Sequence, residues 1–342
     1  MRFLVFIPYR SCIVVLFSFA FAALAANITL YSNDHYNYLD IFNDIDGDVT
    51  SRIEPLFYFV TKLSSYLELS FTSYWLLLSF LSFYIKISIL EKQKCSVLIL
   101  IFLCVIYLSS LGILHEITQI RASIAISFGC MFIFYWANNK RITGVFCLLI
   151  AIGMHYSAGL FLLSFVIRLG QNRLSFFRLI IFTAVACILP LIATNSASIF
   201  DSINPLFSLY LNNSENVTAG TVSVTTLLAI LSLCPVFIFL RKYNAKGFLL
   251  YNFKLYILGV VFLIVFSFSP VLSIRVYELF SFCLFIIVAL LFSSREQNII
   301  FGDINPDKWF YIIRIFFLII LVVISLHRHL AFIYVNPILN FN

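Results

Sequence analysis

Residues 95–137 read CSVLILIFLCVIYLSSLGILHEITQIRASIAISFGCMFIFYWA, in which a short polar cluster separates two apolar runs at 95–114 and 118–137. Each run has about the 20 residues that a helix needs to cross the hydrocarbon of a bilayer. A backbone in lipid must satisfy its own hydrogen bonds, and continuous apolarity differs from the alternating pattern of a membrane β-barrel strand. The stretch therefore predicts two membrane helices.

The rest of the chain has the same character. Of 342 residues, 62% are hydrophobic and 11% are charged, whereas soluble proteins carry roughly 25% charged residues. Further apolar stretches lie at 3–27, 71–90, 179–195, 225–240, 250–268 and 310–328, and shorter ones at 142–154, 156–169 and 279–292. We expect an all-α, polytopic integral membrane helix bundle, a single transmembrane domain over residues 1–342, with about 11 membrane segments.

The basic connections predict the orientation of these segments, because short cytoplasmic loops are rich in Lys and Arg. Such connections lie at 91–94, 138–141, 171–178 and 241–246. The intervening segments are acidic or neutral, which predicts outer loops at about 28–70, 196–224 and 269–278. The N-terminus is then inside and the C-terminus outside.

Two features of the topology allow alternatives. Only 28 residues, 142–169, separate two basic connections, so we expect a re-entrant hairpin of short helices bent near Gly153-Met154-His155. One long helix would instead invert every later loop. Arg2 and Ala23-Leu24-Ala25 are compatible with a cleaved signal peptide, but the length of the first apolar run favours an uncleaved helix.

Several classes of function are disfavoured. The eight cysteines lie in or beside apolar segments without close pairs, so no disulfide or metal site is expected. The chain lacks a phosphate-binding glycine loop, a zinc-protease motif and a nucleophile elbow, and we expect no cofactor. The net charge of +7 is explained by the cytoplasmic loops and does not point to nucleic acid. The absence of a convincing internal repeat weakens a transporter built from inverted halves.

The first predicted outer loop alternates aromatic and acidic side chains. Asp34, Tyr36 and Tyr38 lie close together, and Glu54 precedes Pro55, which suits the first turn of a short interfacial helix over 55–67. Aromatic rings can pack on the apolar faces of sugars, and carboxylates can accept sugar hydroxyl protons. The alternative is a solvated acidic loop. The spacing of Asp44, Asp46 and Asp48 indicates a turn rather than a calcium site.

The second cluster is His115 to Arg121. Helical spacing would place His115 and Gln119 on one face, with Arg121 continuing the same side. A guanidinium at the outer surface can hold phosphate through two parallel hydrogen bonds, or it can simply reach the lipid headgroups. His155, at the predicted bend, is a candidate proton acceptor because imidazole works near neutral pH, although a lone histidine is often structural.

The third cluster contains Arg275, Tyr277 and Glu278. Arg275 and Glu278 could pair with each other, but Arg121 and Arg275 together would suit a pyrophosphate, whose departing charge needs positioned cations. Lys86, Lys254 and Arg314 lie near predicted cytoplasmic ends and are expected to reach the membrane surface. The interior of the bundle is therefore predicted to be dry.

These clusters resemble the EpsG-type group of Wzy-like bacterial polymerases of O-antigen or exopolysaccharide. The resemblance rests on Asp34-His35-Tyr36-Asn37-Tyr38, Glu54-Pro55-Leu56-Phe57, Ile120-Arg121-Ala122-Ser123-Ile124-Ala125, Met154-His155-Tyr156-Ser157-Ala158 and Arg275-Val276-Tyr277. That group often has Gln directly after the Arg of the fourth segment. Here Ala122 follows Arg121 and Gln119 precedes it, which leaves a role for the amide open.

The resemblance implies a GT-C-like fold in the bacterial inner membrane and a reaction on the periplasmic face. It implies transfer of a glycan from undecaprenyl pyrophosphate to another lipid-linked oligosaccharide among membrane lipids, with a chain-length regulator as a candidate partner and no nucleotide sugar. It would give the catalytic roles to Arg121, Arg275 and His155. Substrate binding would fall to Asp34, Tyr36, Tyr38, Glu54, His115, Gln119, Tyr277 and Glu278.

Two other functions stay open. An O-antigen ligase would use the same donor and transfer the glycan to lipid A core, although a ligase usually has a larger late outer loop. A flippase would move the lipid-linked unit without chemistry and would need polar groups deep inside several helices.

Overall fold

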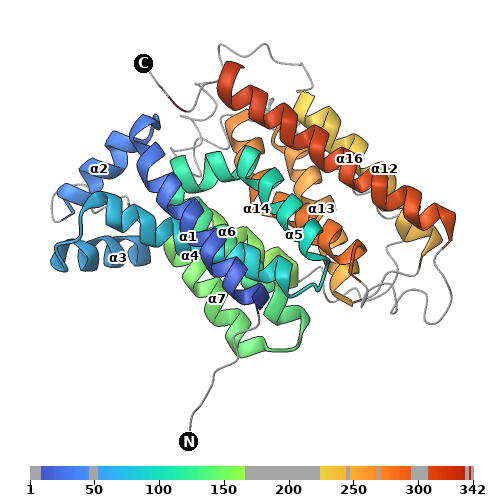
Figure 1. Ribbon diagram of the computed structural model, residues 1–342, viewed down its shortest axis with the longest axis horizontal. Helices are drawn as coiled ribbons and strands as arrows, with labels where there is room; N and C mark the ends of the chain where they lie inside the picture. Colours follow the sequence, from blue (N-terminus) through green and yellow to red (C-terminus); the bar gives the residue numbers. More distant parts are fainter. Residues whose placement is uncertain are drawn as a thin grey trace, which may run out of the picture. The chain divides into compact units, whose positions relative to one another are not determined.

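The computed structural model describes residues 9–45, 53–165, 224–243, 247–267, 270–293, 307–335 and 339. Within these residues the regular elements are all helices (Figure 1). The predicted all-α membrane bundle is therefore confirmed.

The helices follow the predicted apolar stretches closely. The first half contains α1 (Tyr9–Ile28), η1 (Thr29–Tyr31), α2 (His35–Asn43), α3 (Pro55–Tyr66), α4 (Phe71–Glu91), α5 (Val97–Tyr107), η3 (Leu108–Thr118), α6 (Ile120–Ala137), α7 (Arg141–Met154) and η4 (Tyr156–Leu162). The second half contains α12 (Val224–Lys242), α13 (Gly247–Val265), α14 (Pro270–Leu291), α16 (Lys308–Leu330) and η5 (Ala331–Val335). The short helix α2 in the first loop was not predicted.

Seven helical segments among the described residues are long and apolar enough to cross a membrane. They are Arg10–Tyr31, Phe71–Glu91, Val97–Thr118, Ile120–Ala137, Gly247–Val265, Leu272–Leu291 and Lys308–Leu330. Shorter apolar helices occupy Arg141–Met154, Tyr156–Phe165 and Val224–Leu240. The predicted segment at 179–195 and the loop at 196–223 lie outside the described residues, and the total of 11 stays a prediction.

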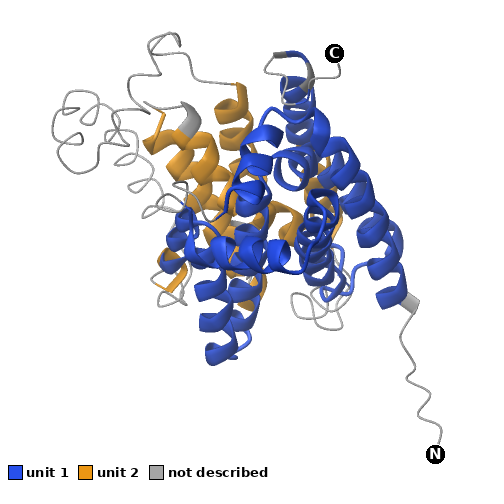
Figure 2. Cartoon of the chain, turned by 90° about the vertical axis from the view of Figure 1, so that its left-hand side faces the viewer, with its two compact units in different colours: residues 1–162, 289–304, 321–342 blue, residues 163–288, 305–320 orange. Residues whose placement is uncertain are grey.

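The chain divides into two compact units (Figure 2). Unit 1 contains residues 1–162, 289–304 and 321–342, and unit 2 contains residues 163–288 and 305–320. Helix α16 is shared between the units, because its residues up to 320 belong to unit 2 and its residues from 321 belong to unit 1.

Unit 1 is built around α4 and α6. Helix α1 packs on α4, α4 packs on α6, and α6 forms a hairpin with α7. The turn between α6 and α7 contains Asn139 in the left-handed region, with φ of 63°. Because α6 and α7 are consecutive and joined by a short turn, the start of α6 and the end of α7 lie at the same end of the hairpin.

The predicted bend near residues 153–155 is present. Helix α7 ends at Met154, and His155 is extended with φ of −160° and ψ of 122°. The chain then continues as the 3₁₀-helix η4, which packs back on α6. Helix η4 approaches α6 closely at Gly129, where a Cβ atom would lie 2.1 Å from the ring of Phe161.

Unit 2 contains α12, α13 and most of α14. Helix α12 packs on α13, and the ammonium of Lys242, in its last turn, lies 2.6 Å from Asp307. Hydrogen bonds from Lys242 and Tyr243 lower the pKa of Asp307 to about 2. Residues 270–278, which were expected in an outer loop, form the first turns of α14.

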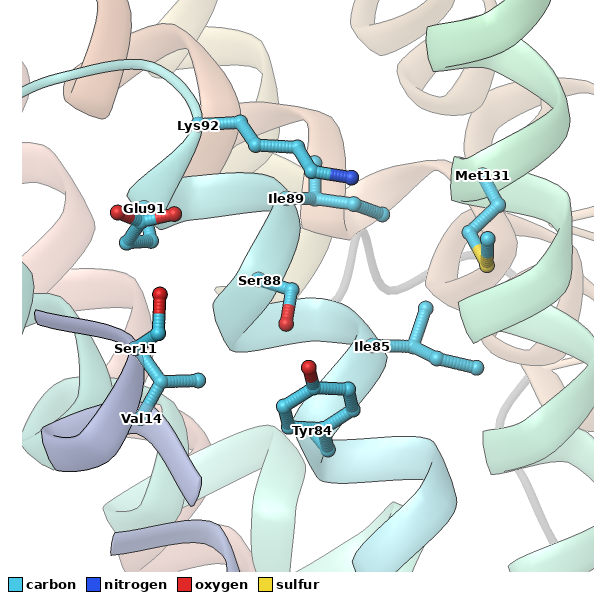
Figure 3. Close-up of a pocket in the computed structure, with 9 residues that line it drawn as sticks. All are labelled: Ser11, Val14, Tyr84, Ile85, Ser88, Ile89, Glu91, Lys92 and Met131. Atoms are coloured by element: carbon cyan, nitrogen blue, oxygen red, sulfur yellow. The ribbon is translucent and has the colours of Figure 1, made fainter. Parts of the chain in front are cut away.

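A pocket of about 210 Å³ lies between α1, α4 and α6 in unit 1. Figure 3 shows the side chains around it, which are Ser11 and Val14 from α1, Tyr84, Ile85, Ser88, Ile89, Glu91 and Lys92 from the end of α4, and Met131 from α6. It belongs to the end of α4 that carries the basic connection 91–94. This end is opposite to the one at which α4 begins, beside α3.

We predict that Gly129→Ala destabilises the protein, because the added methyl group would displace the buried Phe161 ring. Overpacking of this kind costs about 1–3 kcal/mol. The measurement is the thermal unfolding midpoint in detergent. Gly159→Ala is the matched control, since a Cβ there meets no atom within 4 Å. Equal midpoints for the two variants would contradict the packing described here.

Candidate active site

The carboxylate of Glu54 joins two residues that were predicted independently to be catalytic. Its Oε1 lies 2.6 Å from Nδ1 of His155, and its Oε2 accepts a hydrogen bond of 3.0 Å from Nη1 of Arg121. Arg121 and His155 lie 67 and 101 positions beyond Glu54 along the chain. Together with Tyr38 and Phe57 they are called the Glu54 site below.

The helix packing of unit 1 explains why these residues meet. Arg121 is in the first turn of α6 and His155 follows the last turn of α7, so the antiparallel hairpin places them at one end. Glu54 is the residue before α3, and Pro55 occupies the first turn as predicted. Helix α3 packs on α7, where a Cβ on Gly153 would lie only 2.9 Å from Leu56. This close approach brings Glu54 to His155.

Two aromatic rings hold the guanidinium of Arg121. Its Cζ lies 5.3 Å from the ring centre of Tyr38 and 5.4 Å from that of Phe57, distances at which cation–π attraction acts. Nε of Arg121 also donates a 3.4 Å hydrogen bond to the Tyr38 hydroxyl. Within the described residues the hydrogen bonds of this guanidinium use Nε and Nη1, which leaves Nη2 for a ligand.

The side chains of Arg121, His155 and Glu54 differ in exposure. The side chains of Arg121 and His155 are 27% and 28% exposed, whereas that of Glu54 is 5% exposed. A ligand can therefore touch the guanidinium and the imidazole while the carboxylate stays beneath them.

Glu54 is charged at neutral pH. Burial raises its pKa, but the hydrogen bond with His155 and the positive charge of Arg121 outweigh burial, so the pKa falls below its ordinary value of 4.5. A carboxylate can only accept hydrogen bonds, so Nδ1 of His155 donates to it. In the neutral imidazole, Nε2 then has a free lone pair and can accept a proton.

Tyr38 keeps its phenolic proton at neutral pH. Its pKa is raised mainly by burial, which outweighs the opposing effect of Arg121. The edge of its ring meets Trp75 with the ring centres 5.2 Å apart. Tyr38 therefore contributes a neutral hydroxyl and a packed ring to the site.

The remaining residues predicted in the first loop lie in or beside α2. Asp34 is the residue before α2 and is half-buried, and its backbone N–H donates to Ser32. Tyr36 is 71% exposed. A ligand could reach both, and their part in substrate binding stays a prediction.

His115 and Gln119 differ from the expected arrangement. Gln119 lies between η3 and α6 with φ of −120° and ψ of 58°, so the prediction that it continues one helical face with His115 is wrong. His115 is 1% exposed, and its Nδ1 lies 3.4 Å from the Tyr107 hydroxyl. A role in substrate binding stays a prediction for both residues.

The third predicted cluster belongs to unit 2, on α14. Arg275 is exposed, whereas Tyr277 and Glu278 are buried. The Tyr277 hydroxyl lies 3.4 Å from that of Tyr256 on α13. The joint action of Arg121 and Arg275 stays a prediction.

Sequence reasoning missed a buried ion pair in unit 1. Lys86 was expected to reach the membrane surface, but its side chain is 1% exposed and its ammonium lies 2.7 Å from Glu116, which is fully buried. The prediction of a dry interior is therefore wrong for this unit. The signal was present in the sequence, because Lys86 inside one apolar run and Glu116 between the next two are opposite charges near membrane depth and point to a pair.

Phe57 was also not predicted as a site residue. Its place in the family-resembling motif Glu54-Pro55-Leu56-Phe57 was a signal in the sequence, but its contact with Arg121 is seen only in the structure. Among the described residues no three His, Cys, Asp or Glu side chains gather in a way that could hold a metal ion.

Comparison with known protein families shows which family the chain belongs to. The sequence model of the EpsG family matches residues 9–337. The chain belongs to the EpsG family. No curated protein and no solved structure is significantly similar to it.

Membership of the EpsG family supports a role of polysaccharide-polymerase type. It agrees with the seven apolar helices, which describe a multi-pass membrane protein of a bacterial family. Four of the family-resembling motifs contribute to or adjoin the Glu54 site, through Tyr38, Glu54, Phe57, Arg121 and His155.

We predict that the Glu54 contacts stabilise the protein at neutral pH and are lost only in acid. Because the folded-state pKa is lowered, the stabilisation is present above the ordinary value of 4.5 and disappears as pH falls through the folded-state value. The unfolding midpoint of the protein should exceed that of Glu54→Gln at every pH from about 8 to about 5, and the difference should shrink at lower pH.

Glu68→Gln is the matched control, because Glu68 is an exposed carboxylate outside the Glu54 site. Its midpoint should follow that of the unchanged protein at every pH. A difference for Glu54→Gln that already declines between about pH 7 and pH 6 would contradict a lowered pKa at Glu54.

Proposed function

We propose that this EpsG-family chain polymerises lipid-linked oligosaccharide repeat units of O-antigen or exopolysaccharide type. It would transfer the growing glycan from undecaprenyl pyrophosphate to the terminal sugar hydroxyl of another lipid-linked unit. The observation that carries the proposal is the contact of one buried carboxylate, Glu54, with both Arg121 and His155. This contact places a cation and a candidate base next to each other.

The transfer breaks one bond and forms one bond. The bond between the anomeric carbon of the growing glycan and the pyrophosphate oxygen breaks, and its electron pair leaves with the pyrophosphate. The acceptor hydroxyl oxygen bonds to the anomeric carbon, and its proton passes to a base. The reaction therefore needs a cation at the leaving group and a proton acceptor at the hydroxyl.

Arg121 suits the leaving group. Its guanidinium is held in place by Tyr38, Phe57 and the hydrogen bond to Glu54. A cation held in place before the reaction stabilises developing negative charge without reorganising. The Nη2 donor, which makes no hydrogen bond within the described part of the chain, and the 27% exposure of the side chain allow contact with a phosphate oxygen.

His155 suits the acceptor hydroxyl. Glu54 accepts from Nδ1 and so orients the ring, which leaves Nε2 to take the proton. A carboxylate behind an imidazole also stabilises the imidazolium that forms, as in other His–carboxylate pairs that serve as bases. Glu54 is then a positioning residue that supports both partners, rather than the sugar ligand that was expected.

The predicted orientation agrees with this chemistry. The Glu54 site lies at the start of α6 and the end of α7, and the basic turn 138–141 joins the other ends of these helices. If the basic turn is cytoplasmic, as the charge rule predicts, the site faces the periplasm. A lipid-linked donor reaches it from the outer leaflet of the inner membrane.

The other predicted residues complete the proposal. Arg275 would supply a second cation to the pyrophosphate, and Asp34 and Tyr36 would bind sugars near the site. His115, Gln119, Tyr277 and Glu278 would have supporting roles in binding the substrate. A chain-length regulator and the surrounding lipids are the proposed partners.

A ligase that transfers the glycan to lipid A core would use the same cation and base, so it differs only in the acceptor. A flippase would need polar groups along a path through the helices. The Lys86–Glu116 pair is such a buried polar group, but all three ammonium donors of Lys86 bind within unit 1. They are therefore not available to a passing anion.

We predict that Arg121→Ala and His155→Ala each lower polymer formation by about a hundredfold or more, which is the usual effect of removing a transition-state contact. The assay incubates the purified protein with the undecaprenyl-pyrophosphate-linked repeat unit, without nucleotide sugar, and separates products by size. Arg121→Lys should recover little activity, because an ammonium cannot reproduce the planar guanidinium between two rings.

Arg141→Ala is the matched control. Arg141 is exposed at the start of α7 and lies over the Trp136 ring, at the other end of the hairpin. It should retain full activity. Near-normal polymer length in both site variants would refute the assigned roles, and a product formed only with lipid A core as the acceptor would favour the ligase.

A further inference from the structure

A closed polar cluster occupies the interior of unit 1, where the proposed reaction does not use it. The ammonium of Lys86 donates to Glu116 at 2.7 Å, to Ser123 at 2.8 Å and to Ser82 at 3.1 Å. An ammonium has three donors, and all three are used. This set, with Tyr107, is called the Lys86–Glu116 cluster below.

The carboxylate of Glu116 is equally well bound. Tyr107 donates to its Oε2 at 2.8 Å, and Ser123 donates to its Oε1 at 2.8 Å. The side chains of Lys86 and Glu116 are 1% and 0% exposed. A charge pair inside a membrane segment is costly to bury, and pairs of this kind usually serve function or specify one arrangement of the helices. A cluster without a free donor or an opening is suited to holding helices rather than to binding a substrate.

The cluster spans the break between η3 and α6. Glu116 lies before the break and Ser123 lies after it, and Lys86 from α4 binds both. The break itself is at Gln119, whose backbone is not helical. Lys86 therefore joins the two membrane helices that meet at Gln119.

Side chains of α4 also form hydrogen bonds with the backbone next to the break. The carbonyl of Glu116 accepts a 2.8 Å hydrogen bond from Nε1 of Trp75 and a 3.1 Å hydrogen bond from the Ser79 hydroxyl. A helix break in a membrane frees carbonyl groups that need such partners. Helix α4 thus supplies the ammonium, the indole and the hydroxyl that stabilise the interruption.

The break sets the position of the first turn of α6, which carries Arg121. Ser123, bound by Lys86, is two residues beyond Arg121 on that helix. Trp75, which binds the Glu116 carbonyl, also packs against Tyr38, and the Tyr38 hydroxyl accepts from Arg121. Two continuous sets of contacts therefore connect the cluster with the guanidinium.

We propose that Lys86 and Glu116 are positioning residues whose buried pair holds the break at Gln119 and thereby directs Arg121 onto Glu54. The catalytic meaning of this arrangement rests on the proposed function, because Arg121 is there the pyrophosphate-binding cation. The inference that the pair directs Arg121 onto Glu54 does not depend on the proposed function. It can be tested without measuring polymer formation.

The test measures protonation of Glu54 by infrared spectroscopy as the pH is varied. For each protein, the spectrum of the same protein with Glu54→Gln is subtracted, so that the remaining carboxyl signal belongs to Glu54. In Glu116→Gln, the midpoint of Glu54 protonation should rise, because Arg121 moves away from the carboxylate. Glu91→Gln is the matched control, since Glu91 lies at the end of α4 outside the cluster, and it should leave the midpoint unchanged. An unchanged midpoint in folded Glu116→Gln would overturn the proposal.

A double variant covers the case in which Glu116→Gln fails to insert because Lys86 is left unpaired. Lys86→Met with Glu116→Leu removes the hydrogen bonds of the pair but leaves no unpaired buried charge. The Glu54 midpoint should rise in this variant as well, whereas Lys92→Met, which changes an exposed lysine of the same region, should have no effect. An unchanged midpoint in the double variant would refute the proposal.

Kinetics give a second readout. Glu116→Gln should lower polymer formation by about a hundredfold, as misplacement of a catalytic group by roughly 1 Å does. Combined with Arg121→Ala, it should cause no further loss, because both changes remove the same contact. Additive losses would indicate a purely structural role. If the unchanged protein forms no polymer, the proposed function fails, while the Glu54 titration still decides the positioning role.

Discussion

The structure depends on one constraint, which is that a polar group in a low-dielectric interior must find a partner of its own. In unit 1 this constraint acts twice, at Glu54 near one end of the helices and at Glu116 inside them. Each carboxylate binds a cation together with hydrogen-bond donors, so each one joins elements that are distant in sequence. The two carboxylates differ in access. Glu54 supports groups that a ligand can touch, whereas Glu116 is enclosed on all sides by α4, η3 and α6.

This difference in access matches the two proposed roles, which are reaction chemistry at the Glu54 site and positioning at the Lys86–Glu116 cluster. Arg121 and His155 are partly exposed and retain atoms for a ligand, which is what a transfer from a lipid pyrophosphate requires. Lys86 uses its donors within the protein, which agrees with the proposed role of holding the chain where two membrane helices meet at Gln119. Helix α4 connects the two sites, since Trp75 binds the backbone of Glu116 and packs against Tyr38.

Much of the fold was predictable, because membrane helices follow from local composition. The apolar runs at 71–90 and 118–137 became α4 and α6 with ends shifted by at most two residues, and the bend at His155 followed from the charge rule. Arg121, Glu54 and His155 were recognisable as polar groups at predicted membrane boundaries. Errors arose where tertiary contacts decide. Gln119 leaves the helix because partners on α4 stabilise the break, and Lys86 stays inside because Glu116 faces it.

The sequence by itself determined that this protein is a bundle of membrane helices and which residue types stand near their ends, because apolarity and charge act over one segment at a time. The tertiary structure alone decided that Glu54 binds both Arg121 and His155, that Phe57 packs against the guanidinium, and that His115 is enclosed. These facts depend on which helix ends meet and on how close glycines such as Gly153 allow them to come. Contacts between residues a hundred positions apart are set by packing, which no local pattern specifies.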